Sequence, residues 1–78
     1  MYILYGRVGN WSEIDRDESE KEIVITMGDC MRKLNITEFM VKEGDDFAMP
    51  YKIIKNVKDY WEYQEEVENK CKKLTKHR

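Results

Sequence analysis

Histidine and proline are almost absent from this chain of 78 residues, which contains one of each, and cysteine occurs twice. The one histidine, His77, lies beside the C-terminus, where a frayed end cannot hold a general base in a fixed geometry. Cys30 and Cys71 are too far apart for a redox pair and too few for a zinc site, so we expect reduced thiols. Gly6 and Gly9 lack the spacing of a phosphate-binding loop. We therefore expect a non-enzymatic protein without a cofactor or metal.

Long apolar runs are also missing. No stretch approaches the roughly 18 apolar residues that a membrane span needs. Residues 1–7 lack the basic start and the long apolar segment of a signal peptide. These two absences predict a protein that stays in the cytoplasm of the cell that makes it and has no membrane partner.

What the sequence does contain is a mixture typical of a small globular domain. Apolar residues make up 41%, charged residues 38% and aromatic residues 12%. We expect one domain over residues 1–78, with a core too small for a large internal cavity. The net charge of −2 is unevenly distributed, because residues 1–50 carry 6 basic and 11 acidic side chains, whereas residues 51–78 carry 8 and 5.

The first segments predict a β-hairpin. Residues 2–8 are rich in β-branched and aromatic side chains and end at the turn dipeptide Gly9-Asn10. Residues 11–15 show a weaker strand pattern, in which alternation places Trp11, Glu13 and Asp15 on one face.

Ser19 and Glu22 match a helix capping box, and the following apolar residues recur at helical spacing up to Asn35, a favourable stop. The competing interpretation is a strand over residues 22–26, because three β-branched residues and Gly28 disfavour a helix interior. We favour the helix because its cap and its apolar register agree over the whole segment.

The second half repeats this order. Residues 37–42 predict a strand that closes in the acidic turn 43–46, and residues 51–55 predict a short strand after Pro50. Asn56 can cap a final helix, whose apolar stripe is widened by Trp61. The stripe consists of Val57, Tyr60, Gln64, Val67, Cys71 and Leu74. The order β-β-α-β-β-α predicts an α+β fold with an antiparallel sheet of three to four strands and two helices on one face.

The densest acidic run is the candidate functional site. Its spacing fails as a calcium-binding EF-hand loop, because a loop that begins at Asp15 has Glu20 at the glycine position and Thr26 at the final glutamate position. A solvated loop and an acid-rich first helical turn are the ordinary explanation. The alternative is an acidic patch that imitates a nucleic-acid backbone or binds a basic groove of another protein. Trp11 and Tyr63, taken as exposed, are added as aromatic contacts. The predicted partner-binding residues are Trp11, Glu13, Asp15, Asp17, Glu18, Glu20 and Tyr63.

The final helix also fits three heptads, with Val57, Gln64 and Cys71 at one seam position. This pattern would support a homodimer through the C-terminal helix, although packing of the helix on its own sheet is the simpler interpretation. A different functional hypothesis is an oligomer that binds a small ligand or nucleotide between protomers, in a pocket lined by aromatic residues and the basic C-terminal helix.

The segments 5–7, 11–15, 38–41 and 50–54 together resemble the small accessory proteins of phages and mobile elements of Gram-positive bacteria. This resemblance implies a short, acidic, cytoplasmic protein of a class that includes inhibitors of host defence such as anti-CRISPR proteins. It assigns no function to any single residue. Combined with the acidic run, it predicts an inhibitor that occupies a basic, nucleic-acid-binding surface of a host or phage protein, such as a nuclease complex.

Overall fold

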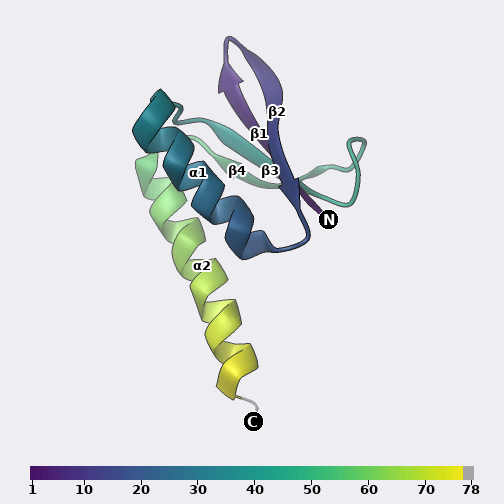
Figure 1. Ribbon diagram of the computed structural model, residues 1–78, viewed down its shortest axis with the longest axis vertical. Helices are drawn as coiled ribbons and strands as arrows, with labels where there is room; N and C mark the ends of the chain where they lie inside the picture. The colour runs from purple at the N-terminus through teal and green to yellow at the C-terminus, as the bar shows by residue number, and fades with distance from the viewer. Residues whose placement is uncertain (77–78) are drawn as a thin grey trace.

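The computed structural model describes the backbone of residues 1–76 and the side chains of residues 1–70. Its elements are β1 (Tyr2–Val8), β2 (Asn10–Asp17), α1 (Glu20–Leu34), β3 (Phe39–Glu43), β4 (Pro50–Ile54) and α2 (Val57–Lys76). The four strands form one antiparallel sheet in the order β2-β1-β3-β4, and the two helices run beside it (Figure 1). The predicted α+β fold and its element order are confirmed.

Both helices pack on the same face of the sheet, because a single buried cluster contains residues of the strands and of both helices. Leu4 of β1, Val41 of β3 and Ile54 of β4 belong to the same buried cluster as Ile23 of α1 and Val67 of α2. The opposite face carries no helix in the described part of the chain (Figure 1). The fold is therefore a sheet covered on one side, with its second side available at the surface.

The ends of α1 follow the local signals of the sequence. The Ser19 side chain accepts a hydrogen bond from the Glu22 amide at 3.4 Å, as an N-cap does. At the other end Asn35 has a φ of 58°, in the left-handed conformation that terminates helices and that asparagine tolerates well. The helix predicted from this cap is confirmed, and the alternative strand over residues 22–26 is wrong.

The β1–β2 hairpin contains an irregularity that alternation alone does not predict. Tyr5 pairs with Glu13, whereas the adjacent Leu4 pairs with Asp15, so Ile14 is an extra residue in β2. Paired residues share a face of the sheet, so this β-bulge turns Glu13 away from the helices and Asp15 toward α1. The expectation that Glu13 and Asp15 lie on one face is therefore wrong.

The helix α2 begins as expected, but its buried side matches the predicted stripe only in part, because Val67 and Tyr60 of the stripe pack on the core whereas Val57 is exposed. Asn56 Oδ1 accepts a hydrogen bond from the Asp59 amide at 2.9 Å. Tyr63 and Val67 are buried, at 1% and 4% exposure, whereas Trp61 is 63% exposed. The prediction that Tyr63 is an exposed contact residue is wrong, because residues 63 and 67 lie one turn apart on the side that meets the sheet.

Candidate functional site: an acidic end of the sheet

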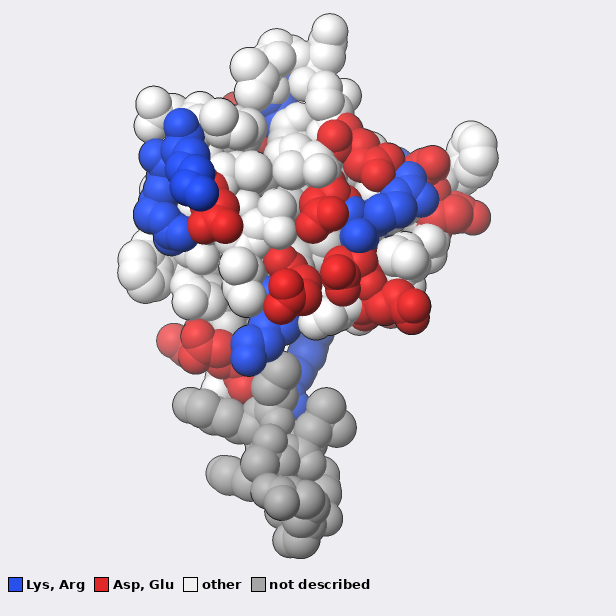
Figure 2. All heavy atoms as spheres, in the orientation of Figure 1, with Lys and Arg blue, Asp and Glu red and all other residues white. Residues whose placement is uncertain are grey.

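Acidic side chains gather at the end of the sheet where β1 begins and where β2 and β3 end. The pairings of Tyr2 with both Asp17 and Glu43 bring these two carboxylates to either side of one residue. Figure 2 shows acidic side chains grouped over β2, the start of α1 and the loop between β3 and β4. We name this group the acidic surface. It consists of Glu13 and Asp46 toward the face without helices, Asp15, Asp17 and Glu43 toward the face with the helices, and Glu18 and Asp45 in the adjoining loops.

A three-residue cluster links β2 to the loop between β3 and β4. Arg16 donates to Glu13 through Nε at 2.8 Å and Nη2 at 2.7 Å, and the same Nη2 lies 3.1 Å from Asp46 Oδ1. The Tyr5 hydroxyl donates to Asp46 Oδ1 at 2.9 Å. The hydrogen bonds from Arg16 lower the pKa of Glu13, so this carboxylate keeps its charge below the usual range. The cluster fixes the loop against β2 and joins acids far apart in sequence.

The predicted acids of the run differ in how accessible they are. Glu13 and Glu18 are exposed, but Asp15 and Asp17 are half-buried. Asp15 Oδ2 accepts from the Thr26 hydroxyl at 3.2 Å, and Asp17 Oδ1 accepts from the Ser19 amide at 2.7 Å. Asp15 and Asp17 therefore also stabilise the start of α1 and its packing on β2.

Glu20 lies inside the fold and not on the acidic surface. Its Oε2 accepts from the buried Tyr63 hydroxyl at 2.6 Å, and its Oε1 lies 3.2 Å from Lys70 Nζ. Lys70 also donates to the Tyr51 hydroxyl at 2.7 Å. Burial, followed by the hydrogen bond to Glu20, raises the pKa of Tyr63 strongly. Tyr63 and Glu20 are thus used to join α1, β4 and α2, which leaves neither for a partner.

The loop between β3 and β4 carries two exposed apolar residues that sequence reasoning missed. Phe47 is 95% exposed and Met49 is 84% exposed. Asp45 holds the loop in a turn, since its Oδ1 accepts from the Phe47 amide at 2.9 Å and its carbonyl accepts from the Ala48 amide at 3.1 Å. The available signal was a pair of large apolar residues directly after an acidic turn, at a position with no periodic pattern.

Trp11 is 40% exposed, and its pairing with Arg7 places it on the sheet face without helices. Glu13, two residues further along β2, shares that face. The prediction that Trp11 is accessible beside part of the acidic run is confirmed, and the structure adds Arg16 to the same group.

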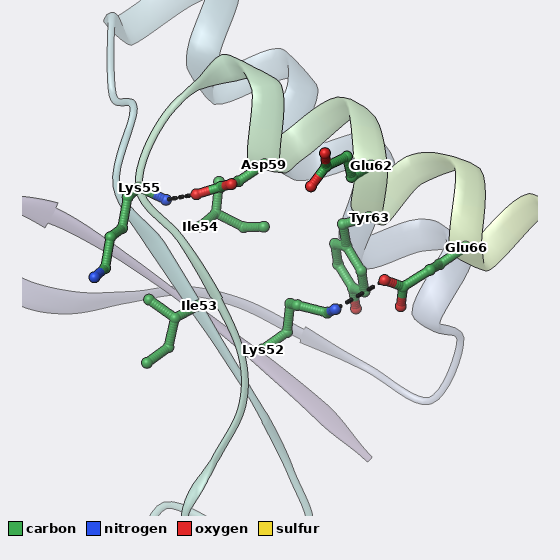
Figure 3. Close-up of a pocket in the computed structure, with 8 residues that line it drawn as sticks. All are labelled: Lys52, Ile53, Ile54, Lys55, Asp59, Glu62, Tyr63 and Glu66. Carbon is green, nitrogen blue, oxygen red and sulfur yellow. Dashed lines mark hydrogen bonds and ion pairs between the residues drawn. The ribbon is translucent and has the colours of Figure 1, made fainter.

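A shallow hollow of about 360 Å³ lies between β4 and α2 (Figure 3). Lys52 Nζ lies 3.0 Å from Glu66 Oε2, and Asp59 Oδ2 accepts a hydrogen bond from the Lys55 backbone amide at 3.0 Å. Figure 3 shows Lys52 reaching from the strand toward Glu66 on the helix. These two contacts join β4 and the residue after it to α2.

Cys30 is buried, and desolvation, followed by the charge of Asp29, raises the pKa of its thiol. A raised pKa lowers the fraction of the reactive thiolate at neutral pH. Within residues 1–70 no three side chains of the metal-ligating types are grouped as a metal site requires. The predicted roles of His77 and of the side chains of Cys71 and Leu74 lie outside the described residues.

No family model, curated protein or solved structure matches this chain. In the described part of the chain, neither helix combines the length and the apolar character needed to cross a membrane. The residues and geometry above are consequently the basis for the functional argument.

Proposed function

We propose that this protein is a non-enzymatic binding protein whose acidic surface occupies a basic, nucleic-acid-binding surface of another protein. The observation that carries the proposal is the convergence of carboxylates from β2, from the end of β3 and from the loop between β3 and β4. Carboxylates fixed on a rigid sheet end can match the phosphates that such a basic surface normally binds.

The loop between β3 and β4 supports the proposal in a second way. Binding energy at protein interfaces concentrates in a few buried apolar anchors, which charged groups surround. Phe47 and Met49 are positioned for that role, because Asp45 and Asp46 precede them and the turn holds them outward. A protein partner with an apolar pocket beside its basic surface fits this arrangement better than a purely electrostatic partner does.

The resemblance to phage and mobile-element accessory proteins gives the partner class. A nuclease of host defence has an extended basic surface for nucleic acid and would lose activity when that surface is occupied. The proposed function is therefore inhibition by occlusion, in the host cytoplasm, without a chemical step.

The test is a differential capture from nuclease-treated Gram-positive bacterial lysate at low salt. Immobilised wild type is compared with Glu18→Lys and with Glu43→Lys, which each reverse an exposed charge of the acidic surface. Glu62→Lys, an equal charge reversal on α2, is the matched control. We expect that wild type and the control capture the same proteins and that both surface variants fail to capture them. An added DNA duplex should displace these proteins from wild type.

Two results would overturn the proposal. One is that wild type and both surface variants retain the same proteins, in which case the acidic surface is solvated surface only. The other is that the captured proteins resist displacement by DNA, because the occupied surface would then not be one that binds nucleic acid.

A further inference from the structure

An apolar hollow of about 510 Å³ opens between α1 and α2, away from the acidic surface. Its apolar lining comes from Met31 of α1 and from Val57, Tyr60 and Trp61 of α2. Val57 is 49% exposed and Trp61 is 63% exposed. Contiguous exposed apolar side chains are one of the surface features that mark interaction sites.

The indole of Trp61 is held in place in the single chain. The rings of Tyr60 and Trp61 meet edge to face, with centroids 6.2 Å apart. An aromatic side chain that is already ordered loses little conformational entropy on binding. Trp61 is therefore suited to be the anchor of an interface.

Charges of opposite sign flank Trp61. Arg32 of α1, which forms an ion pair with Asp29 of the same helix, lines the apolar hollow, whereas Glu65 and Glu68 line a separate hollow that also includes Trp61. Figure 2 shows basic side chains over the end of α1 and acidic side chains further along α2. The end of α1 keeps a net positive charge despite this pair, because Lys33 also lies in its last turn, whereas Glu65 and Glu68 are both negative.

From this arrangement we propose that two copies of the chain associate about a two-fold axis that passes beside Trp61. A two-fold interface brings the same patch of both copies together, so a surface must complement itself. Rotation about Trp61 places Arg32 of one copy opposite Glu65 of the other, twice. A partner of uniform charge would meet repulsion on one side of Trp61, which is why a second copy fits best.

The dimer is independent of the proposed function, because it uses a different part of the molecule. It leaves the acidic surface of each copy exposed, so the assembly presents two of them. Linked binding sites gain avidity when a partner offers two matching surfaces.

Sedimentation velocity over a wide concentration range tests the dimer. We expect wild type to approach twice the chain mass of 9.5 kDa. Trp61→Ser should raise the dissociation constant by about thirtyfold or more, as the loss of an aromatic anchor does. Phe47→Ala, which removes another exposed aromatic side chain, is the matched control and should leave the dissociation constant unchanged.

Charge reversal tests the two-fold arrangement without altering the apolar centre. Arg32→Glu, which also breaks the ion pair with Asp29, and Glu65→Arg should each weaken the dimer. The double variant should associate more tightly than either single variant, because the exchanged charges face each other again across the interface. Far-ultraviolet circular dichroism of each variant is the control for correct folding. A monomeric wild type, a dimer insensitive to Trp61→Ser, or a double variant weaker than both single variants would each overturn the proposal.

Discussion

At the scale of single residues, the hydrogen bonds around the Tyr63 hydroxyl join three elements of the fold. It donates to Glu20 at the start of α1, while Lys70 of α2 binds both that carboxylate and Tyr51 of β4. Among the described residues, no buried side-chain nitrogen or oxygen lacks a hydrogen-bond partner. Removal of one member therefore leaves another polar atom without its partner, which is the costly case.

Tyr63→Phe should keep the fold and lower the free energy of unfolding by about 1.5–3 kcal/mol, the cost of one hydrogen bond to a charged acceptor. Urea denaturation at pH 7 measures this value. Tyr2→Phe is the control, because Tyr2 is half-buried but its hydroxyl donates no hydrogen bond to a described side chain. It should change the free energy of unfolding little. Equal stability of wild type and Tyr63→Phe would show that the hydroxyl contributes nothing.

The pH dependence of stability should also depend on Tyr63. The pKa of Tyr63 is raised in the folded protein. The folded protein therefore keeps the hydroxyl proton at pH values above about 10, where the unfolded chain releases it. The stabilisation is thus complete below about pH 10 and is lost as the pH rises. The pKa of Lys70 is raised as well, chiefly by Tyr51, and acts in the same direction. Urea denaturation from about pH 9 to 11 should show a shallower decline for Tyr63→Phe than for wild type.

Phe47 provides the opposite case, a large apolar residue without a structural role. Because its side chain is 95% exposed, Phe47→Ala should leave the free energy of unfolding within about 0.5 kcal/mol of wild type. The same substitution should abolish or weaken capture of the proposed partner. A clear loss of stability would show that Phe47 packs on the protein itself, contrary to a role as a binding anchor.

At the scale of elements, helix ends were predictable because their signals are local. Ser19, Asn35 and Asn56 each act through backbone groups within a few residues, so the sequence alone predicts where α1 begins and ends and where α2 begins. The buried side of α2 was not predictable in this way. Both Trp61 and Tyr63 offer a large aromatic ring, and only the long-range contact with Glu20 and the sheet decides that Tyr63 faces inward.

The bulge at Ile14 is another long-range outcome. Alternation in residues 11–15 is compatible with a regular strand, and the extra residue becomes visible only in the pairing with β1. The Ile14 side chain also lies against Gly6, where a Cβ atom would collide with it. The composition of the acidic run was therefore predictable, but its division between two faces was not.

The contact between the helices depends on a missing side chain at Gly28. A Cβ atom there would lie 2.5 Å from the Tyr60 hydroxyl and 3.2 Å from Cζ of the same ring. Gly28→Ala should lower the free energy of unfolding by about 1 kcal/mol, although alanine is the better helix former, because the half-buried Tyr60 ring or the helices themselves must shift. Urea denaturation at one fixed protein concentration measures the change.

Tyr60→Phe is the background that isolates this collision. Without the hydroxyl a small shift of the ring accommodates the new methyl group, so the helix propensity of alanine dominates. In that background Gly28→Ala should be neutral or stabilising. An equal loss of stability in both backgrounds would attribute the effect of Gly28→Ala to something other than Tyr60.

At the scale of the whole molecule, the two proposed surfaces lie on different parts of a fold that needs neither for its core. The carboxylates of the acidic surface come from β2, β3 and two loops, whereas Trp61 and Arg32 belong to the helices. The sequence revealed the excess of acid in its first half, but not that Asp45 and Asp46 join the earlier run, since Arg16 makes that link across 30 positions.

A surface that serves binding need not be optimal for folding, and the acidic surface makes this testable. Glu43 is exposed, and Asp17 and Glu43 lie on either side of Tyr2. Burial, followed by the negative charges of Glu20 and Glu43, raises the pKa of the Tyr2 hydroxyl. Glu43→Lys should therefore raise the free energy of unfolding by a few tenths of a kcal/mol at low salt, since it replaces repulsion by attraction. The gain should vanish at about 1 M salt, where the Debye length is about 3 Å. If the Glu43→Lys variant is less stable than wild type at low salt, Glu43 supports the fold. Its presence in the acidic surface would then not require a role in binding.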